Sequence, residues 1–364
     1  RDKLVTGVQT CALPILLWGG VEVEELVFSV SDRAADVEWR LGSGAASADL
    51  DARTVVLDDG EELAFDGLVA ATGVASRRLN APGPTVGRTV LRSLDDALGL
   101  RDRLRPGGRL VSLGAGFIGC EVAATARRAG CDVDIVAIDR APMVVPLGQE
   151  VGEELRRRHE AAGIRFHLGR TIVETRGGDE VEQVVLDDGD VLPADIVLET
   201  IGSIPNTTWL EGNDLDLTNG VLCDEHLRPG GRTGIVAVGD VARFANPLFD
   251  APPLRIEHWQ TAIDTAVFAA GTLLHALGIS AEPPRPVSIL PWFWSDQGDV
   301  RLTSYGMLGL ADRIEILAGD LHGDCAIGYY RADEAVGVAL IGMKTSAARY
   351  KQWLTKERKA VLAR

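Results

Sequence analysis

Residues 109–139 read RLVSLGAGFIGCEVAATARRAGCDVDIVAID, which is the pattern of a strand, a glycine turn, a helix and a second strand. The turn at 114–119 is a G-x-G-x-x-G, whose small residues let the backbone approach a pyrophosphate at a helix N-terminus. An apolar run, Leu110–Leu113, precedes the turn, a helix is expected through Glu121–Ala129, and Cys131–Ile138 suits a second parallel strand. The turn alone would also fit an ordinary glycine-rich loop. Because strands and a helix flank it in this order, the stretch predicts a dinucleotide-binding βαβ unit.

Composition places the chain among globular proteins. Its 364 residues are 46% hydrophobic and 25% charged, which suffices for a large core and two or three domains. The formal net charge of −16 argues against general nucleic-acid binding, and no apolar run reaches membrane-spanning length. The five cysteines are scattered without a C-x-x-C, so neither a zinc site nor a redox dithiol is expected, and a reducing cytoplasmic location is the default.

The first residues are expected to lie outside the fold. Val5–Ile15, VTGVQTCALPI, resembles the translation of a common sequencing-library adapter. Leu13–Trp18 is apolar, but it lacks the charged start and the small-residue cleavage site of a signal peptide. We therefore expect residues 1–15 to be an artefact and the true N-terminus of the gene to lie upstream.

An internal repeat indicates two domains of one design. Val55–Gly60 (VVLDDG) recurs as Val184–Gly189, and the shared pattern continues to Gly73 and Gly202 at a constant offset of 129 residues. Each copy predicts a hairpin with an Asp-Gly turn that leads into a buried strand. Two unrelated hairpins could share the turn by chance, but hardly the whole register. Because the glycine loop at 114–119 precedes the second copy, a matching loop for the first copy is expected upstream of the chain.

Two later segments carry candidate binding residues. A short apolar strand ends in Gly239-Asp240, where a carboxylate can accept hydrogen bonds from hydroxyls of a bound ligand or can cap the next helix. Arg255–Ala270 is expected to form a helix that opens with Glu257-His258-Trp259, although Trp259 also fits a buried aromatic with a polar edge.

The last part of the chain differs in composition. Prolines at 283–286 predict a linker, and Pro291–Gln297 (PWFWSDQ) holds three aromatic residues. Strands followed by a closing helix, Ser346–Lys359, predict a small α+β domain. The closing helix is basic, which fits either a solvated helix or a docking patch for a partner. Its cationic residues are Arg349, Lys351, Lys356, Arg358 and Lys359. The expected strands are Val300–Tyr305, Arg313–Ala318, Ala326–Arg331 and Ala335–Ile341.

Together these motifs resemble the FAD-dependent NAD(P)H:ferredoxin reductases of bacterial oxygenase systems, a group of two-dinucleotide-binding-domain flavoproteins. The most specific carriers are Arg255–Trp259 (RIEHW) and Pro291–Gln297, whereas Ala71-Thr72-Gly73, the 114–119 loop and Gly239-Asp240 are common to many flavoproteins. The implied fold class is α/β, with two Rossmann-like nucleotide-binding domains, the first incomplete, and a C-terminal α+β domain. The implied division is 1–15 artefact, 16–98 first part of the FAD-binding domain without its first βαβ unit, 99–218 NAD(P)-binding domain, 219–282 second part of the FAD-binding domain, and 283–364 C-terminal reductase domain.

The same resemblance assigns cofactor residues. The FAD candidates are Thr72, Gly73, Gly239, Asp240, Glu257, His258, Trp259 and Trp294. The NAD(P) candidates are Gly114, Gly116, Phe117, Ile118, Gly119, Asp139, Arg140 and Gly202. Glu121 matches an acidic residue near the flavin and is the catalytic candidate, although a glutamate in a first helical turn is also favoured by the helix dipole.

The implied activity is electron transfer from NADH or NADPH through FAD to a 2Fe-2S ferredoxin or a similar iron–sulfur acceptor that serves an oxygenase. Asp139 bonding a ribose would suit NADH, Arg140 pairing a 2′-phosphate would suit NADPH, and we favour NADH. Two departures stand out: the FAD glycine loop is missing, and Ala137 stands where an acid is expected about 20 residues after the 114–119 loop. FAD binding by this fragment is therefore expected to be weak or absent. The alternatives are a rubredoxin reductase and an NAD(H)-sensing flavoprotein that acts by binding.

Overall fold

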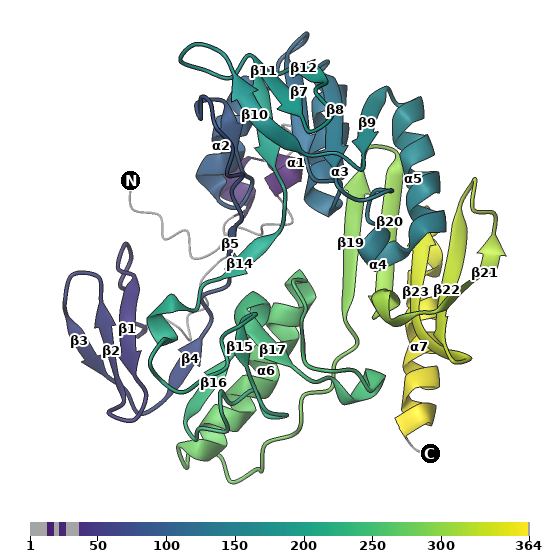
Figure 1. Ribbon diagram of the computed structural model, residues 1–364. Coiled ribbons are helices and arrows are strands. Elements are labelled where there is room, and N and C mark those ends of the chain that lie inside the picture. The colour runs from purple at the N-terminus through teal and green to yellow at the C-terminus, as the bar shows by residue number, and fades with distance from the viewer. Residues whose placement is uncertain (1–12, 18–21, 27–35, 363–364) are drawn as a thin grey trace. The chain divides into compact units, whose positions relative to one another are not determined.

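The computed structural model describes residues 13–17, 22–26 and 36–362 (Figure 1). The chain forms two compact units, and each unit is assembled from separate segments. Of the described residues, the first unit contains 13–17, 22–26, 76–203 and 294–354, and the second contains 36–75, 204–293 and 355–362. The chain therefore passes more than once between the two units.

A five-stranded parallel sheet forms the centre of the first unit, with the strand order β6-β13-β7-β8-β9. Residues of β7, β8 and β13 are nearly all buried, as expected for a parallel sheet that is covered on both faces. The strands are β6 (Arg88–Thr89), β7 (Arg109–Leu113), β8 (Asp132–Ala137), β9 (Ile164–Leu168) and β13 (Ile196–Glu199). The predicted βαβ unit is thus confirmed as β7, α3 and β8.

Helices accompany this sheet: α2 (Leu94–Arg103), α3 (Phe117–Arg128), α4 (Val144–Leu147) and α5 (Gln149–Ala161). A capping box starts α2, because the Ser93 hydroxyl accepts the Asp96 N–H at 3.1 Å and the Asp96 carboxylate accepts the Ser93 N–H at 2.8 Å. Helix α3 begins at Phe117, four residues earlier than predicted, since Gly116 is its N-cap.

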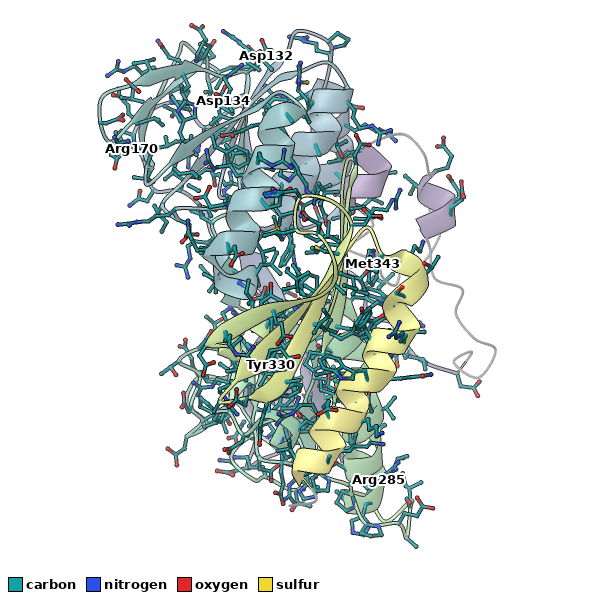
Figure 2. All side chains as sticks on the ribbon, turned by 90° about the vertical axis from the view of Figure 1, so that its right-hand side faces the viewer. Asp132, Asp134, Arg170, Arg285, Tyr330 and Met343 are labelled. Atoms are coloured by element: carbon teal, nitrogen blue, oxygen red, sulfur yellow. The ribbon has the colours of Figure 1, made fainter. Side chains whose placement is uncertain are left out.

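A buried carboxylate joins β8 to β9. Asp134 accepts hydrogen bonds from Arg165 at 2.7 and 2.9 Å and from His167 at 2.9 Å (Asp134 is labelled in Figure 2). Burial opposes ionisation of this group, but the Arg165 guanidinium and His167 lower the pKa of Asp134 overall. The ion pair therefore fixes the pairing of two neighbouring strands in the nucleotide-type sheet.

A short helix, α1 (Leu13–Leu17), also belongs to the first unit and contacts α2 and α3. Leu13, Leu16 and Leu17 are buried, because the spacing i, i+3, i+4 places them on one helix face. This helix begins inside the segment 1–15 that the sequence analysis set apart from the fold. Residues 1–12 lie outside the described residues.

Both copies of the internal repeat form three-stranded antiparallel sheets. One copy is β1-β2-β3 (Ala45–Asp49, Thr54–Leu57, Glu62–Ala64), and the other is β10-β11-β12 (Ile172–Arg176, Gln183–Leu186, Val191–Pro193). The pairs Val55–Leu63 and Val184–Leu192 occupy matching positions, and the first strand of each copy carries an irregularity at its start. The predicted repeat of an Asp-Gly hairpin leading into a strand is confirmed.

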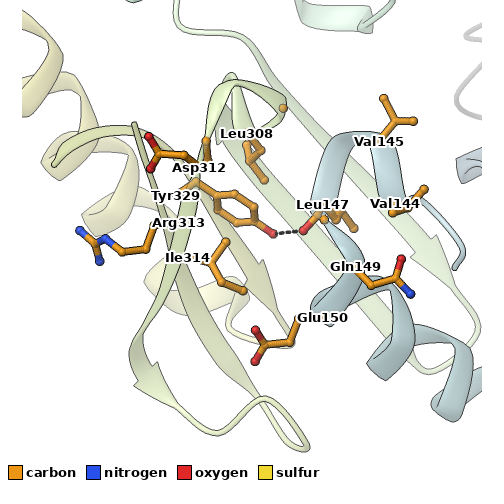
Figure 3. A pocket seen from close by; sticks show the side chains of 13 residues that line it. Val144, Val145, Leu147, Gln149, Glu150, Leu308, Asp312, Arg313, Ile314 and Tyr329 are labelled. Atoms are coloured by element: carbon orange, nitrogen blue, oxygen red, sulfur yellow. Dashed lines mark hydrogen bonds between the residues drawn. The ribbon is translucent and has the colours of Figure 1, made fainter. Parts of the chain in front are cut away.

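The C-terminal sheet has the order β19-β20-β23-β22-β21, and the pairings of β20 with β23, β23 with β22 and β22 with β21 are antiparallel. Its strands are β19 (Trp292–Gln297), β20 (Val300–Gly306), β21 (Arg313–Gly319), β22 (Cys325–Arg331) and β23 (Glu334–Ile341), followed by α7 (Ala347–Leu362). The Tyr329 hydroxyl donates to the Leu147 carbonyl at 2.8 Å, beside a pocket of about 350 Å³ (Figure 3). This contact ties β22 to the end of α4 within the first unit.

The second unit pairs β4 (Leu68–Ala70) with β16 (Ile235–Ala237) in parallel and contains the sheet β15-β17-β18 (Val221–Leu222, Ala242–Phe244, Leu254–Arg255). Helix α6 (Trp259–Ala276) contacts β16. Its predicted first residues, 255–258, are extended instead, because Arg255 ends β18 and His258 is the N-cap. Strands β5 (Val74–Ser76) and β14 (Ser203–Pro205) pair with each other where the chain passes between the units.

Candidate functional site

The glycine loop after β7 has the backbone that a pyrophosphate site requires. Gly114 has φ +113°, and a Cβ there would overlap the Thr200 carbonyl oxygen. A Cβ on Gly119 would overlap the Gly114 carbonyl oxygen. Side chains would therefore be excluded at the tight turn and at the close approach of α3 to β7.

Gly116 differs from both, since a Cβ at this position would meet no atom within 4 Å. It is the N-cap of α3, and its conformation is extended, without a side-chain cap. The first hydrogen bond of the helix runs from the Cys120 N–H to the Gly116 carbonyl at 3.0 Å. The N–H groups of the first turn, at 117–119, point out of the helix end toward this open space, where an anion is favoured.

Two hydroxyl groups that the sequence analysis did not single out hold the loop. Thr200 donates to the carbonyls of Leu113 at 3.0 Å and Gly114 at 3.2 Å, and Ser112 donates to Gly114 at 3.3 Å. Thr200 stands at the end of the second repeat copy, directly after β13. Thr200 could have been selected from the sequence, because it directly follows a predicted buried strand whose end faces the glycine loop.

Asp139 and Arg140 lie just beyond the end of β8, whose last residue, Ala137, is buried. Both side chains are exposed, and neither makes a hydrogen bond to another side chain or backbone group of the described residues. Each is therefore available to a ribose that follows a pyrophosphate on the loop. Gly202, the other candidate on this side, has φ +96° and open space around its Cα.

Glu121 projects from α3 two residues after the loop, and the Ser295 hydroxyl of β19 donates to its carboxylate. Burial raises the pKa of Glu121 to about 7, and this hydrogen bond opposes the rise. The partner is separated by 174 positions along the chain, so no local spacing could have identified it. Trp294, a predicted FAD residue, is the neighbour of Ser295 on β19 and belongs to the first unit.

In the second unit, Thr72 and Gly73 are fixed by Asn206. The Thr72 hydroxyl donates to the Asn206 carbonyl at 2.7 Å, and the Asn206 side-chain amide donates to the Thr72 carbonyl at 2.8 Å. The Asn206 N–H donates to the Gly73 carbonyl at 3.0 Å, and Gly73 has φ +62°. Asn206, which the sequence analysis did not select, therefore shapes the turn after β4.

Arg255 connects two other candidates. It donates to the Asp240 carbonyl at 3.0 Å and pairs with the Glu257 carboxylate at 2.7 Å. The Gly239 N–H donates to the Thr265 hydroxyl of α6 at 3.0 Å. The second unit thus brings Gly239, Asp240 and Glu257 together through the N-terminal half of α6 and the residues before it.

His258 caps this helix, and its Nδ1 is buried with no hydrogen-bond partner in the part of the chain that the structure describes. Burial lowers the pKa of His258 to about 4, so the ring is neutral at pH 7. The Phe293 ring lies 5.0 Å away, and Trp259 is the first helical residue. A buried nitrogen without a partner beside an aromatic ring suits a flat polar ligand, so His258 and Phe293 are compatible with a flavin.

The candidates divide between the two units. The NAD(P) set, Glu121 and Trp294 lie in the first unit, whereas the other FAD candidates lie in the second.

Among the residues that the structure describes, no group of three or more His, Cys, Asp or Glu could hold a metal, and no helix is long and apolar enough to cross a membrane. The fold and the glycine loop define a nucleotide-dependent oxidoreductase.

Comparison with known proteins identifies the family. Residues 5–266 match the pyridine nucleotide-disulphide oxidoreductase family and residues 292–364 match the reductase C-terminal domain, so the chain belongs to this family. The ferredoxin–NAD(+) reductase component of the anthranilate 1,2-dioxygenase system of Burkholderia cepacia is 36% identical over 79% of this chain and 68% of its own. Putidaredoxin reductase of Pseudomonas putida is 31% identical over 93% and 80%.

Solved structures agree with the sequence relatives. The covalent putidaredoxin reductase–putidaredoxin complex matches with a TM-score of 0.87 at 30% identity, covering 96% of this chain and 84% of the solved one. The predicted family resemblance and fold class are confirmed, and the enzyme class with them. The family implies FAD and a nicotinamide nucleotide as cofactors.

The four cysteines that the structure describes do not form a dithiol pair. Cys120, Cys131, Cys223 and Cys325 are buried free thiols. Burial raises the pKa of each, to about 12 for Cys223 and about 11 for Cys325, so the thiolate form is disfavoured at neutral pH. Among the described cysteines, disulfide exchange therefore has no suitable nucleophile.

Proposed function

We propose that this protein passes electrons from NADH, through FAD, to a ferredoxin of the 2Fe-2S type that serves an oxygenase. The observation that carries the proposal is the open Gly116 position at the N-terminus of α3, in a chain that also has the reductase C-terminal domain. The relatives named as ferredoxin–NAD(+) reductase components of dioxygenase systems support the electron acceptor. The buried free thiols support transfer without a protein dithiol.

In this proposal the first unit binds the nicotinamide nucleotide. The N–H groups of Phe117, Ile118 and Gly119 receive the pyrophosphate, and Asp139 accepts hydrogen bonds from the adenosine ribose. Arg140 is the residue that would favour NADPH. We favour NADH because a ribose with both hydroxyl groups free suits the exposed Asp139 carboxylate.

The second unit would hold FAD with Thr72, Gly73, Gly239, Asp240, Glu257, His258 and Trp259. Trp294, the remaining FAD candidate, belongs to the first unit. When bound, FAD would supply the redox chemistry, which is acceptance of a hydride and release of single electrons to an iron–sulfur centre. The protein contributes a fixed orientation, exclusion of water and control of charge. The unpaired thiols and the NAD(P)H requirement favour the reducing cytoplasm as the location.

The exposed cations of α7 are the proposed docking surface for the acceptor. Arg349, Lys351, Lys356 and Lys359 are exposed. Arg358, which the sequence analysis grouped with them, is 1% exposed, donates to the Leu248 carbonyl at 2.7 Å and lies over the Phe249 ring. A docking role is therefore proposed for the exposed residues alone.

The nucleotide assignment is tested with Gly116→Ala. Its extended backbone and empty surroundings accept a methyl group, so the stability is expected to stay within about 0.5 kcal/mol of the wild type. The methyl group would occupy the pyrophosphate space, and NADH affinity, measured by NADH fluorescence, is expected to fall at least tenfold. Unchanged affinity would contradict the assignment. Asp139→Ala and Arg140→Ala, compared with NADH and NADPH, decide the nucleotide preference.

The acceptor is tested with purified protein supplied with FAD. NADH-dependent reduction of ferricyanide and of a 2Fe-2S ferredoxin is compared with reduction of rubredoxin, because one relative is a rubredoxin–NAD(+) reductase. Lys351→Glu together with Lys356→Glu should slow ferredoxin reduction severalfold and leave ferricyanide reduction unchanged. Arg285→Glu, at an exposed site outside α7, is the control (Figure 2). Faster rubredoxin reduction would favour that acceptor, and binding of NADH without turnover would favour a sensor.

A further inference from the structure

Glu121 is the end of a chain of hydrogen-bonded side chains within the first unit. The Ser295 hydroxyl donates to the Glu121 carboxylate, and the Gln297 side-chain amide donates to Ser295 at 3.0 Å. The Gln297 carbonyl oxygen lies 2.8 Å from His159 Nε2. These hydrogen bonds therefore join α3, β19 and α5.

The direction of each hydrogen bond follows from the amide of Gln297. Its nitrogen donates to Ser295 and also contacts the Met143 sulfur at 3.2 Å, so its oxygen accepts from His159 Nε2–H. Ser295 accepts from Gln297 and turns its own hydrogen toward Glu121. Every donor therefore points toward one carboxylate, which is the arrangement that stabilises its ionised form.

At the opposite end of the hydrogen-bonded network from Glu121, the His159 imidazole stays neutral and donates a hydrogen bond. Ser295, Gln297 and His159 are 1%, 2% and 2% exposed, and burial lowers the pKa of His159. His159 and Gln297 border a cavity of about 660 Å³. Four arginine residues also border this cavity: Arg127, Arg128, Arg157 and Arg158.

The other titratable groups that face Glu121 do not favour its ionisation. Asp296 of β19 is negative and pairs with Arg301 at 3.0 Å, although its backbone hydrogen-bonds to Glu121. Cys120 of α3 is a buried thiol whose pKa burial raises, so it is neutral. Hydrogen bonds are therefore what stabilises the ionised carboxylate of Glu121. The hydrogen bond from Ser295 is the one that is linked to the side-chain network.

Glu121 also lies close to the proposed nucleotide site. It is four residues beyond Phe117, one helical turn or about 6 Å from the N–H groups that would receive a pyrophosphate. The nicotinamide ring is positively charged when oxidised and neutral when reduced. A nearby carboxylate therefore favours the oxidised form.

We propose that Ser295 and Gln297 are positioning residues that favour the ionised form of Glu121, and that they thereby raise the affinity of the nucleotide site for NAD+ relative to NADH. The inference rests on the proposed nucleotide site of the first unit. It adds a function to the PWFWSDQ segment, whose Ser295 and Gln297 belong to no cofactor set described above.

The test is binding, without turnover. NADH affinity is measured by fluorescence and NAD+ affinity by competition, from pH 5.5 to 9, for wild type and Ser295→Ala. Wild-type NAD+ affinity should rise with pH as Glu121 ionises. In Ser295→Ala the pH inflection should move upward by on the order of one unit, and the preference for NAD+ at pH 7 should fall by up to about fivefold. Ser295→Thr keeps the hydroxyl and should restore both values.

Ser304→Ala is the matched control, since Ser304 is a buried serine of the adjacent strand β20 whose hydroxyl has no partner among the described residues. Gln297→Met should shift the inflection in the same direction but less, because Ser295 still reaches Glu121. If Ser295→Ala fails to fold, Gln297→Met decides the outcome. An infrared carboxylic-acid band at pH 7 in Ser295→Ala, absent from Ser295→Ala combined with Glu121→Gln, would report the protonated group directly.

An unchanged NAD+/NADH ratio in folded Ser295→Ala, or an equal change in Ser304→Ala, would overturn the inference. An equal loss of affinity for NAD+ and NADH would also overturn it, because the Glu121 charge would then act on the pyrophosphate that both nucleotides share. Failure of the wild type to bind either nucleotide would instead contradict the proposed function. The two failures are therefore distinguishable.

Discussion

The two copies of the repeat share a hairpin but differ in the strand that follows it. In the first unit this strand is β13, which lies inside the five-stranded parallel sheet and is buried at every position. In the second unit it is β4, which among the described residues pairs with β16 alone, and Val69 in its centre is 48% exposed. The same sequence pattern therefore specifies the local hairpin, whereas the neighbouring segments determine how deeply the strand is buried.

The two strands also differ in the chemical character of their last residue. Ala70 ends β4, and Glu199 occupies the matching place in β13. The Glu199 carboxylate is fully buried and pairs with Arg88 at 2.7 Å and Arg78 at 2.9 Å. A polar network thus stabilises one copy where the other has a methyl group.

The largest expected effect comes from breaking this network. Glu199→Ala should lower the free energy of unfolding by about 3–5 kcal/mol, because Arg88, whose side chain is 5% exposed, would lose its buried counter-ion. Urea unfolding followed by circular dichroism measures the change. Glu174→Ala in the same repeat copy is the control, since its pair with Arg176 is exposed and its loss should change the free energy of unfolding little.

The reverse exchange sharpens the comparison. Ala70→Glu would place a carboxylate at a site that is 1% exposed and is expected to destabilise the second unit strongly. If the protein tolerated both Ala70→Glu and Glu199→Ala, the two strand ends would be equivalent. This result would contradict the stabilising role of Glu199 in one copy alone.

An intermediate effect is expected from acid. The pKa of His258 falls from 6.5 to about 4 in the folded protein, so the unfolded chain binds the proton more readily. Stability should therefore be full above pH 6.5 and decline by up to about 3 kcal/mol as the pH falls toward 4. His159 in the first unit shifts in the same direction, but its Nε2 has a partner in Gln297.

His258→Leu should remove the second unit's part of this acid sensitivity, as measured by unfolding at pH 7 and pH 4.5. His275→Leu, which changes an exposed histidine of the same helix, should leave the pH dependence as in the wild type. An identical pH dependence in all three proteins would contradict the role of His258.

The smallest effects should be equal in the two copies. Gly60 and Gly189 occupy the Asp-Gly turns with φ +88° and +93°, and no atom lies within 4 Å of an added Cβ. Gly60→Ala and Gly189→Ala should each lower the free energy of unfolding by about 1 kcal/mol, through backbone strain alone. Gly99→Ala, inside α2 and equally uncrowded, should stabilise by up to about 1 kcal/mol. Unequal costs at the two turns would show that the hairpins are not equivalent.

Local pattern predicted the βαβ unit, the repeat and most C-terminal strands, because periodicity and glycine turns depend on neighbouring residues. It predicted no strand at β19, although the aromatic residues of PWFWSDQ also favour strands. It placed Arg358 on a surface, since burial against Phe249 is a long-range contact. The partners of Thr72 and Glu121, Asn206 and Ser295, lie 134 and 174 positions away and leave no trace in spacing.

The discontinuous first unit has a consequence for the order of events on the ribosome. The strands and helices of residues 76–203 can assemble as soon as they emerge, because their contacts are close in sequence. Residues 294–354 of the same unit emerge only after about 90 residues of the second unit have been synthesised. The glycine loop can therefore take shape early in translation, whereas Glu121 acquires its hydrogen-bond donor only when β19 arrives.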